Sequence, residues 1–216
     1  MLSWNKIWSY CGFLLCCILI NPVGAARFDK SINQYVKKTW NNESGLPQNT
    51  ITSIAQTPDG YLWLGSLEGL LRFDGVNFTP FNTRTIENFG HNMVASLFVD
   101  NKGTLWIATS GGGVTRMEAG VFKNYSTNEG LPSNQVSQIF QDNQGTIWIG
   151  TDGGGLVKYQ SGKFISDEFT KANGESIKSI IENKQGLWIA SERGLFHKPL
   201  DRTPVFLIYF LIIHHC

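Results

Sequence analysis

The chain has 216 residues, of which 42% are hydrophobic, so it is long enough for one domain with a substantial core. Its formal net charge is +1 and only 16% of its residues are charged, which argues against a nucleic-acid partner bound through a basic surface. The 23 glycines and the aromatic content of 12% favour strands joined by tight turns, and therefore an all-β fold.

Residues 1–26 have the pattern of a secretory signal peptide. Lys6 supplies a positive charge, a short apolar run extends from Cys11 to Ile20, and small residues follow at Gly24-Ala25-Ala26. The alternative, an uncleaved membrane anchor, is disfavoured because the apolar run is shorter than the ~20 residues that a span requires. We therefore expect an exported, periplasmic chain. Residues 27–39 form a polar lead-in.

A tryptophan motif then repeats along the chain. Its first copy is Asp59-Gly60-Tyr61-Leu62-Trp63-Leu64-Gly65. The repeated tryptophans are spaced 43, 42 and 40 residues apart, at Trp63, Trp106, Trp148 and Trp188. A period of about 40–45 residues, made of short apolar runs and glycine turns, is typical of the blades of a β-propeller.

The first repeat shows how each blade is built. Four short apolar runs, which we call strands A to D, are separated by a tight Asp59-Gly60 turn, a B–C loop at 67–69 and a tight Asp74-Gly75 turn. Four antiparallel strands in about 40 residues make one propeller blade. The repeats predict a partial propeller over residues 40–198, with blades at about 40–82, 92–125, 130–164 and 176–198.

The repeat stops within the fourth blade. After residue 198 there is no Asp-Gly turn and no aromatic strand D, and residues 199–216 form an atypical apolar tail. This tail is either one strand or sequence read out of frame after a frameshift. The abrupt end of the repeat favours the second alternative, so we expect about three and a half blades.

The repeats resemble the two-component regulator propeller family. The resemblance rests on Gly45-Leu46-Pro47-Gln48-Asn49, on the tryptophan motif, and on Gly69-Leu70-Leu71-Arg72-Phe73-Asp74-Gly75, and it covers residues 40–198. Members of this family form the periplasmic sensor part of bacterial membrane receptors. The resemblance implies seven-bladed propellers, then a Y-Y-Y type β-sandwich, a membrane helix and an output domain. The output is a histidine kinase, often hybrid, or a GGDEF diguanylate cyclase.

By this resemblance the chain is an N-terminal fragment that lacks the output domain. We expect a membrane connection only through the missing downstream segments, and dimerisation in the full-length receptor. A partial propeller leaves an exposed sheet edge and an open apolar side. The ligand class is open: an unknown small molecule or, by resemblance only, an oligosaccharide.

The candidate site follows from strand parity. In an antiparallel blade the A–B and C–D turns lie on one rim, and the B–C and D–A connections lie on the other. The A–B and C–D turns are tight and similar among the repeats, whereas the B–C loops differ, and variable loops on a rigid scaffold often carry binding residues. The polar candidates on this rim are Glu68, Ser110, Asp152, Glu192 and Arg193. The alternative is that each is an ordinary solvated turn residue.

Other residues favour structural roles. One tryptophan per blade at the same position predicts core packing between blades, rather than sugar stacking. The glycine triples at 111–113 and 153–155 favour bulged turns over a phosphate cradle, because no helix follows them. We find no catalytic constellation, metal-ligand spacing or cofactor motif. Two further hypotheses remain: an exported propeller enzyme, such as a lyase or hydrolase, and a non-signalling scaffold or adhesion module.

Overall fold

The computed structural model describes residues 37–172, 174–199 and 206–208. The predicted signal peptide, most of the lead-in and most of the apolar tail lie outside these residues. The chain divides into two compact units, Met1–Thr39 and Trp40–Cys216. The strands described below all belong to the second unit.

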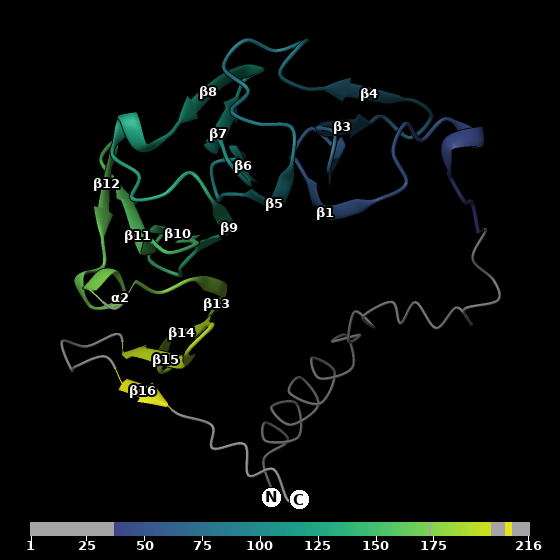
Figure 1. The fold of residues 1–216 in the computed structure, drawn as a ribbon. Helices are drawn as coiled ribbons and strands as arrows, with labels where there is room; N and C mark the ends of the chain where they lie inside the picture. The colour runs from purple at the N-terminus through teal and green to yellow at the C-terminus, as the bar shows by residue number, and fades with distance from the viewer. Residues whose placement is uncertain (1–36, 173, 200–205, 209–216) are drawn as a thin grey trace, which may run out of the picture. The chain divides into compact units, whose positions relative to one another are not determined.

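Four four-stranded antiparallel sheets make up this unit, and we number them blades 1 to 4 in chain order (Figure 1). Blade 1 consists of β1 (Ile51–Gln56), β2 (Leu62–Ser66), β3 (Leu70–Phe73) and β4 (Phe78–Phe81). Blade 2 consists of β5 (Val94–Val99), β6 (Leu105–Thr109), β7 (Gly113–Glu118) and β8 (Val121–Tyr125). Blade 3 consists of β9 (Val136–Gln141), β10 (Ile147–Thr151), β11 (Gly155–Gln160) and β12 (Lys163–Ser166).

Blade 4 consists of β13 (Ile177–Asn183), β14 (Gly186–Ser191), β15 (Gly194–Pro199) and β16 (Phe206–Ile208). Short helices precede three blades: η3 (Asn42–Ser44) before blade 1, η4 (Thr127–Glu129) before blade 3 and α2 (Glu168–Ala172) before blade 4. In every sheet the strands are hydrogen-bonded in chain order, so each blade is a simple meander. This confirms the predicted all-β propeller architecture.

The structure differs from the sequence-based expectation at the end of blade 4. The repeat pattern predicts no strand D there, but Phe206–Ile208 forms β16 and pairs antiparallel with β15. Without β16, strand β15 would expose a row of unpaired backbone N–H and C=O groups. Such a sheet edge readily pairs with another extended segment. The described part of the tail therefore matches the alternative that it contributes one strand.

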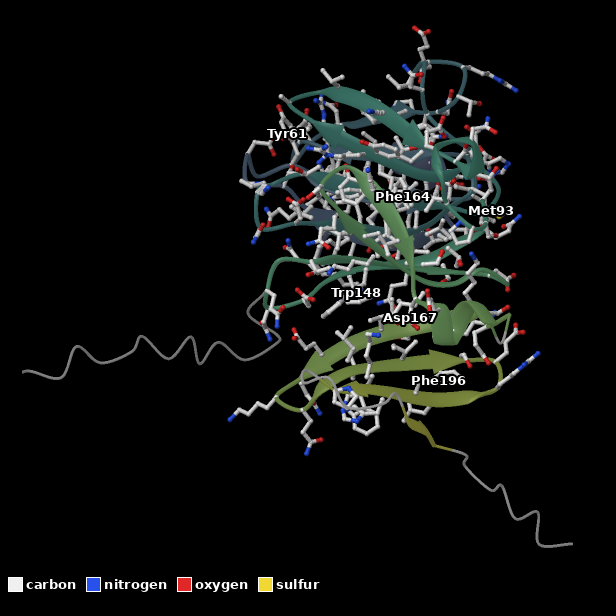
Figure 2. All side chains as sticks on the ribbon, turned by 90° about the vertical axis from the view of Figure 1, so that its left-hand side faces the viewer. Tyr61, Met93, Trp148, Phe164, Asp167 and Phe196 are labelled. Atoms are coloured by element: carbon white, nitrogen blue, oxygen red, sulfur yellow. The ribbon has the colours of Figure 1, made fainter. Side chains whose placement is uncertain are left out.

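The apolar core lies between consecutive blades rather than within any one of them. Trp63 packs with Leu97, Leu105 and Ile107 of blade 2. In the same way, Trp106 packs against β9 and β10 of blade 3. Trp148 packs against blade 4, and Figure 2 shows it on the side of blade 3 that faces this sheet. Because each blade has an apolar face that only its neighbour covers, the stacking of repeats is what creates the core.

The A–B turns fix the indole rings of the first three blades. The Nε1 atom of Trp106 donates to Asp100 Oδ2 at 2.8 Å, and that of Trp148 donates to Asp142 Oδ2 at 2.8 Å. In blade 1, Trp63 Nε1 donates to Thr57 Oγ1 at 2.9 Å. A buried indole N–H requires such an acceptor. The short polar turns therefore have a structural task, as their similarity among the repeats predicts.

Candidate ligand-binding rim

The loops between strands B and C lie together with the D–A connections on one rim, which we call the B–C rim. Its loops comprise residues 67–69, 110–112, 152–154 and 192–193. A hydroxyl group at the end of strand B closes each of the first three loops: Ser66 Oγ donates to Gly69 O at 2.8 Å, Thr109 Oγ1 to Gly113 O at 2.9 Å and Thr151 Oγ1 to Gly155 O at 2.7 Å. These hydroxyl residues are buried, so their hydrogen bonds hold the two ends of each loop in place.

The glycine triple of blade 2 allows close packing at this rim. A Cβ atom on Gly112 would lie 2.3 Å from the carbonyl carbon of Gly90, so only glycine fits there. Gly113 has a φ of +83°, in the left-handed region that favours glycine. The triple is therefore a tight turn against the preceding D–A connection, in agreement with the interpretation as a bulged turn.

A hollow of about 240 Å³ opens on the B–C rim where blades 2, 3 and 4 meet. Its lining includes two of the sequence candidates, Ser110 and Asp152. Both are attached to the start of strand A of blade 3: Ser110 forms an isolated bridge with Gln135, and the backbone N–H of Asp152 donates to Gln135 O at 2.9 Å. Gln135 thus contacts both candidates, and all three residues line the same hollow.

Lys178 connects the hollow to a third candidate. It lies on β13 and lines the hollow, and its Nζ atom is 2.7 Å from Glu192 Oε1. The hydrogen bond with Glu192 raises the pKa of Lys178, and the negative charge of Asp152 acts in the same direction. Lys178 is therefore a protonated ammonium group that pairs with Glu192 of its own blade and shares the lining of the hollow with Asp152 of blade 3.

The structure separates the two remaining candidates from this hollow. Glu68 lines a different hollow of about 210 Å³ in blade 1, beside Gln48. Arg193 points to Glu175 instead, with Arg193 Nε 4.0 Å from Glu175 Oε1. Glu175 is only 2% exposed. Two of the five candidates thus line the hollow together with Lys178, a third, Glu192, pairs with this lysine, and the other two lie elsewhere.

Sequence reasoning missed Lys178 and Gln135 because it considered only the B–C loops. Both residues lie at the start of a strand A, immediately after a D–A connection. The D–A connections lie on the same rim as the B–C loops by strand parity. A polar residue at the start of each strand A is therefore the sequence signal that identifies these two positions.

A larger hollow, of about 410 Å³, lies on the opposite rim between blades 2 and 3. Its lining includes Arg116, Gln144 and Tyr159, and burial raises the pKa of the Tyr159 hydroxyl. Two of its polar residues already serve the fold: Asp100 holds the indole of Trp106, and Gln141 Oε1 accepts from Asn101 N at 2.8 Å. By contrast, no described residue forms a side-chain hydrogen bond with Asp152 on the B–C rim.

The described histidines lie apart from the B–C hollow lining. His91 Nδ1 accepts from the backbone N–H of Met93 at 3.1 Å, and the His197 ring lies 4.4 Å from that of Trp188. Within the described part of the chain, no group of three or more His, Cys, Asp or Glu side chains is arranged to hold a metal ion. None of the described helices is long and apolar enough to cross a membrane.

Three of the repeats match a known family. The two component regulator propeller family matches residues 45–68, 88–111 and 130–153. Each matched stretch runs through strands A and B into the B–C loop, so it covers the part of the blade that builds the junctions and the B–C rim. Curated protein sequences give no significant match.

Solved structures show the same fold. The extracellular domain of BT3049 from B. thetaiotaomicron, described as a hybrid two component system, is 24% identical with a TM-score of 0.69, over 80% of this chain and 26% of that one. Virginiamycin B lyase from Staphylococcus aureus is 14% identical with a TM-score of 0.57, over 80% and 58%. YCF48 from Cyanidioschyzon merolae is 16% identical with a TM-score of 0.50, over 70% and 52%.

These structures have identities below 25%, so they establish the propeller fold and nothing more. The chain spans about a quarter of the length of the BT3049 domain and little more than half of the other two. The combination of matched repeats and shared fold confirms the resemblance inferred from the tryptophan motif.

Proposed function

This chain contains two component regulator propeller repeats, and we propose that it is the periplasmic ligand-sensing module of a bacterial transmembrane signalling receptor. The receptor would carry its output, a histidine kinase or a diguanylate cyclase, outside the described residues. The module acts by binding rather than by catalysis. The observation that carries the proposal is the B–C hollow, which Ser110 of blade 2, Asp152 of blade 3 and Lys178 of blade 4 line together.

The chemistry of the hollow favours a ligand rich in hydroxyl groups. The carboxylate of Asp152 accepts hydrogen bonds, the ammonium group of Lys178 donates them, and the hydroxyl of Ser110 can do both. The charges of Asp152 and Lys178, the two charged residues that line the hollow, offset one another, so a strongly charged ligand gains little. A neutral small molecule with several hydroxyls, such as a short oligosaccharide, is the ligand class that satisfies this set.

The position of the hollow suggests how binding is transmitted. Ser110 belongs to blade 2, Asp152 to blade 3 and Lys178 to blade 4, so one ligand would contact three blades at once. A ligand shifts a receptor only by the difference in its affinity for two states. A ligand that draws these residues together would favour the state with the closer packing of blades 3 and 4, and the downstream segments would carry this change to the output domain.

The proposal is tested by binding measurements on the full chain. A panel of oligosaccharides is screened by calorimetry, and the affinity of any ligand found is then measured for Asp152→Ala and Lys178→Ala. We expect each substitution to weaken binding about tenfold or more, since each removes a hydrogen bond that involves a charged group. The matched control is Gln144→Ala, in the larger hollow on the opposite rim.

Two results would contradict the proposal. If Gln144→Ala weakens binding and the two B–C rim variants do not, the ligand occupies the opposite rim. If the ligand is released as a chemically altered product, the module is an enzyme rather than a sensor.

A further inference from the structure

The strand C residue that pairs with the repeated tryptophan is a cation in the first three blades. The pairs are Arg72 with Trp63, Arg116 with Trp106 and Lys158 with Trp148. Directly opposite residues of an antiparallel pair project from the same face of the sheet, so each cation lies beside its indole. The cation is therefore part of the repeat.

The surroundings of this cation differ between blades 1 and 2. The Cζ atom of Arg72 lies 4.5 Å from the centroid of the Tyr61 ring, so an aromatic side chain covers it. Tyr61 stands two residues before the repeated tryptophan, and Thr104 holds this position in blade 2. Threonine has no ring to lay over the guanidinium of Arg116. In blade 2 the cation instead lines the hollow of about 410 Å³ between blades 2 and 3.

The carboxylate in this lining is already engaged by the fold. Asp100 Oδ1 accepts from the backbone N–H groups of Lys102 and Thr104, both at 2.9 Å. The other oxygen of Asp100 accepts from the indole of Trp106. Both oxygens of Asp100 are thus used by three N–H groups of its own blade.

The two cations in the lining are not engaged to the same extent. Lys102 is exposed in the A–B turn of blade 2, and no described carboxylate forms an ion pair with its side chain. A guanidinium has five N–H donors. The Nη2 atom of Arg116 donates to Glu118, a carboxylate that is 59% exposed, and its Nε atom is buried without a partner among the described residues. The fold therefore leaves donor capacity unused at both cations.

Two tyrosine hydroxyls hold the guanidinium of Arg116 in place. Tyr125 of blade 2 and Tyr159 of blade 3 both hydrogen-bond with it. Burial opposes the charge of Arg116, but the hydrogen bond with Tyr125 and the charge of Glu118 raise its pKa overall. Burial and the hydrogen bond with Tyr125 also raise the pKa of the Tyr159 hydroxyl. Tyr159 therefore stays protonated at neutral pH and adds no negative charge to the lining.

We propose that this hollow is a second binding site, which takes the carboxylate group of a small aromatic acid. Arg116 and Lys102 donate to the carboxylate, since a guanidinium matches its planar geometry. Tyr159 is the partly exposed ring in the lining, beside Trp106 at 5.2 Å between centroids, and it packs on the ring of the ligand. The volume of about 410 Å³ lies within the range of small-molecule pockets.

The two hollows differ in the charge that they offer. In the B–C hollow Asp152 and Lys178 offset one another, which favours a neutral ligand. In the hollow between blades 2 and 3 the carboxylate is used by the fold and the cations are open, which favours an anion. This second site goes beyond the proposed sensing of a hydroxyl-rich ligand and does not depend on it.

Calorimetric titration of the full chain with benzoate at millimolar concentrations is the first test. We expect benzamide, which has the same shape without the charge, to bind at least about tenfold more weakly than benzoate. Inorganic phosphate should also bind at least about tenfold more weakly, because it has no apolar part to pack on Tyr159. Absence of benzoate binding, or binding of benzamide or phosphate as tight as that of benzoate, overturns the proposal.

Charge-neutralising substitutions locate the site. Arg116→Gln and Lys102→Gln should each weaken benzoate binding about tenfold, since each removes a charged donor. Lys102 is an exposed turn residue, so Lys102→Gln tests the site even if Arg116→Gln fails to fold. The matched control is Lys158→Gln, which changes the equivalent cation of blade 3 outside this lining. An effect of the control as large as that of Lys102→Gln, or no effect of Lys102→Gln, contradicts the proposal.

Glu118 provides a test with the opposite sign, because it competes with the ligand for Arg116. Glu118→Gln should strengthen benzoate binding about threefold, the size expected for an exposed ion pair. Unchanged or weaker binding would show that Arg116 does not receive the carboxylate. Asp152→Ala should leave benzoate binding unchanged, although it weakens binding at the B–C rim. Failure of this proposal is thereby distinguished from failure of the proposed function.

Discussion

Trp148 and Trp188 hold the same position in neighbouring blades, yet they have different surroundings. Trp148 is 8% exposed, lies beneath blade 4 and donates to Asp142. Trp188 is partly exposed, stacks with His197 and has no described acceptor for its N–H. The same motif thus gives a core residue at an inner junction and a partly buried residue in the last described blade. In this fold a motif residue is buried by the neighbouring blade at the junction, and not by its own blade alone.

Removing the two tryptophans tests this difference most strongly. Trp148→Ala should lower the free energy of unfolding by ~3–5 kcal/mol, because it empties a packed junction. Trp188→Ala should cost less, roughly 1–2 kcal/mol, since Trp188 is only partly buried and no described blade packs on it from the other side. Denaturant melts of both variants give the comparison. An unchanged midpoint for Trp148→Ala would show that the inner junction is not core.

The strand A isoleucines give the next largest effect. Ile139→Ala should cost about 2–4 kcal/mol because Ile139 is 2% exposed and packs with Trp106. Ile54→Ala, at the equivalent position of blade 1, should cost less than about 1 kcal/mol, because Ile54 is 62% exposed. Similar losses at the two positions would mean that another segment covers blade 1.

The A–B turns provide a polar version of the same comparison. Asp142→Ala should cost about 1–3 kcal/mol, because it leaves the N–H of Trp148 buried without an acceptor. Asn183 is the last residue of strand A of blade 4, and its Oδ1 atom accepts only from Gln185 N among the described residues. Asn183→Ala should therefore change stability little. Thermal melts of the two variants distinguish a turn that holds an indole from one that does not.

The smallest effect concerns the capping boxes of η3 and η4. Hydrogen bonds from the backbone N–H and hydroxyl of Ser126 lower the pKa of Glu129 in the box of η4. Its contribution to stability is therefore complete above the usual glutamate pKa and is lost as the pH falls through the lowered value. The box of η3 uses Asn41 and Ser44, which do not titrate.

The corresponding variants are Glu129→Gln and Ser44→Ala. Glu129→Gln should reduce the loss of melting temperature between neutral and acid pH, whereas Ser44→Ala should lower the melting temperature equally at both. A pH dependence that Glu129→Gln leaves unaltered would assign the acid sensitivity to another carboxyl group.

Much of the fold is predictable because the repeat is local. The spacing of the tryptophans and the Asp-Gly turns give the blades, their strand order and the parity of the rims without any long-range information. Strand β16 is different. Phe206–Ile208 has no turn motif before it, and only the unpaired edge of β15 determines that it forms a strand.

The candidate site was predictable in part. Strand parity places Ser110, Asp152 and Glu192 on one rim, but it does not say which of them meet. Lys178 was missed because an exposed lysine in a strand has no distinctive sequence signal. Glu68 and Arg193 satisfied the same sequence rule and still lie elsewhere, since their distances depend on how the blades pack.

The sequence by itself determined the all-β architecture, the period of the blades, the polar turns and the family of the repeats, since all of these arise within about 40 neighbouring residues. Only the tertiary structure decided which surfaces are core and which candidates share a hollow. Each of those properties is created by contacts between residues one period or more apart. Thus Trp148 and Trp188 hold the same position in the repeat, but among the described residues only Trp148 is covered by a following blade.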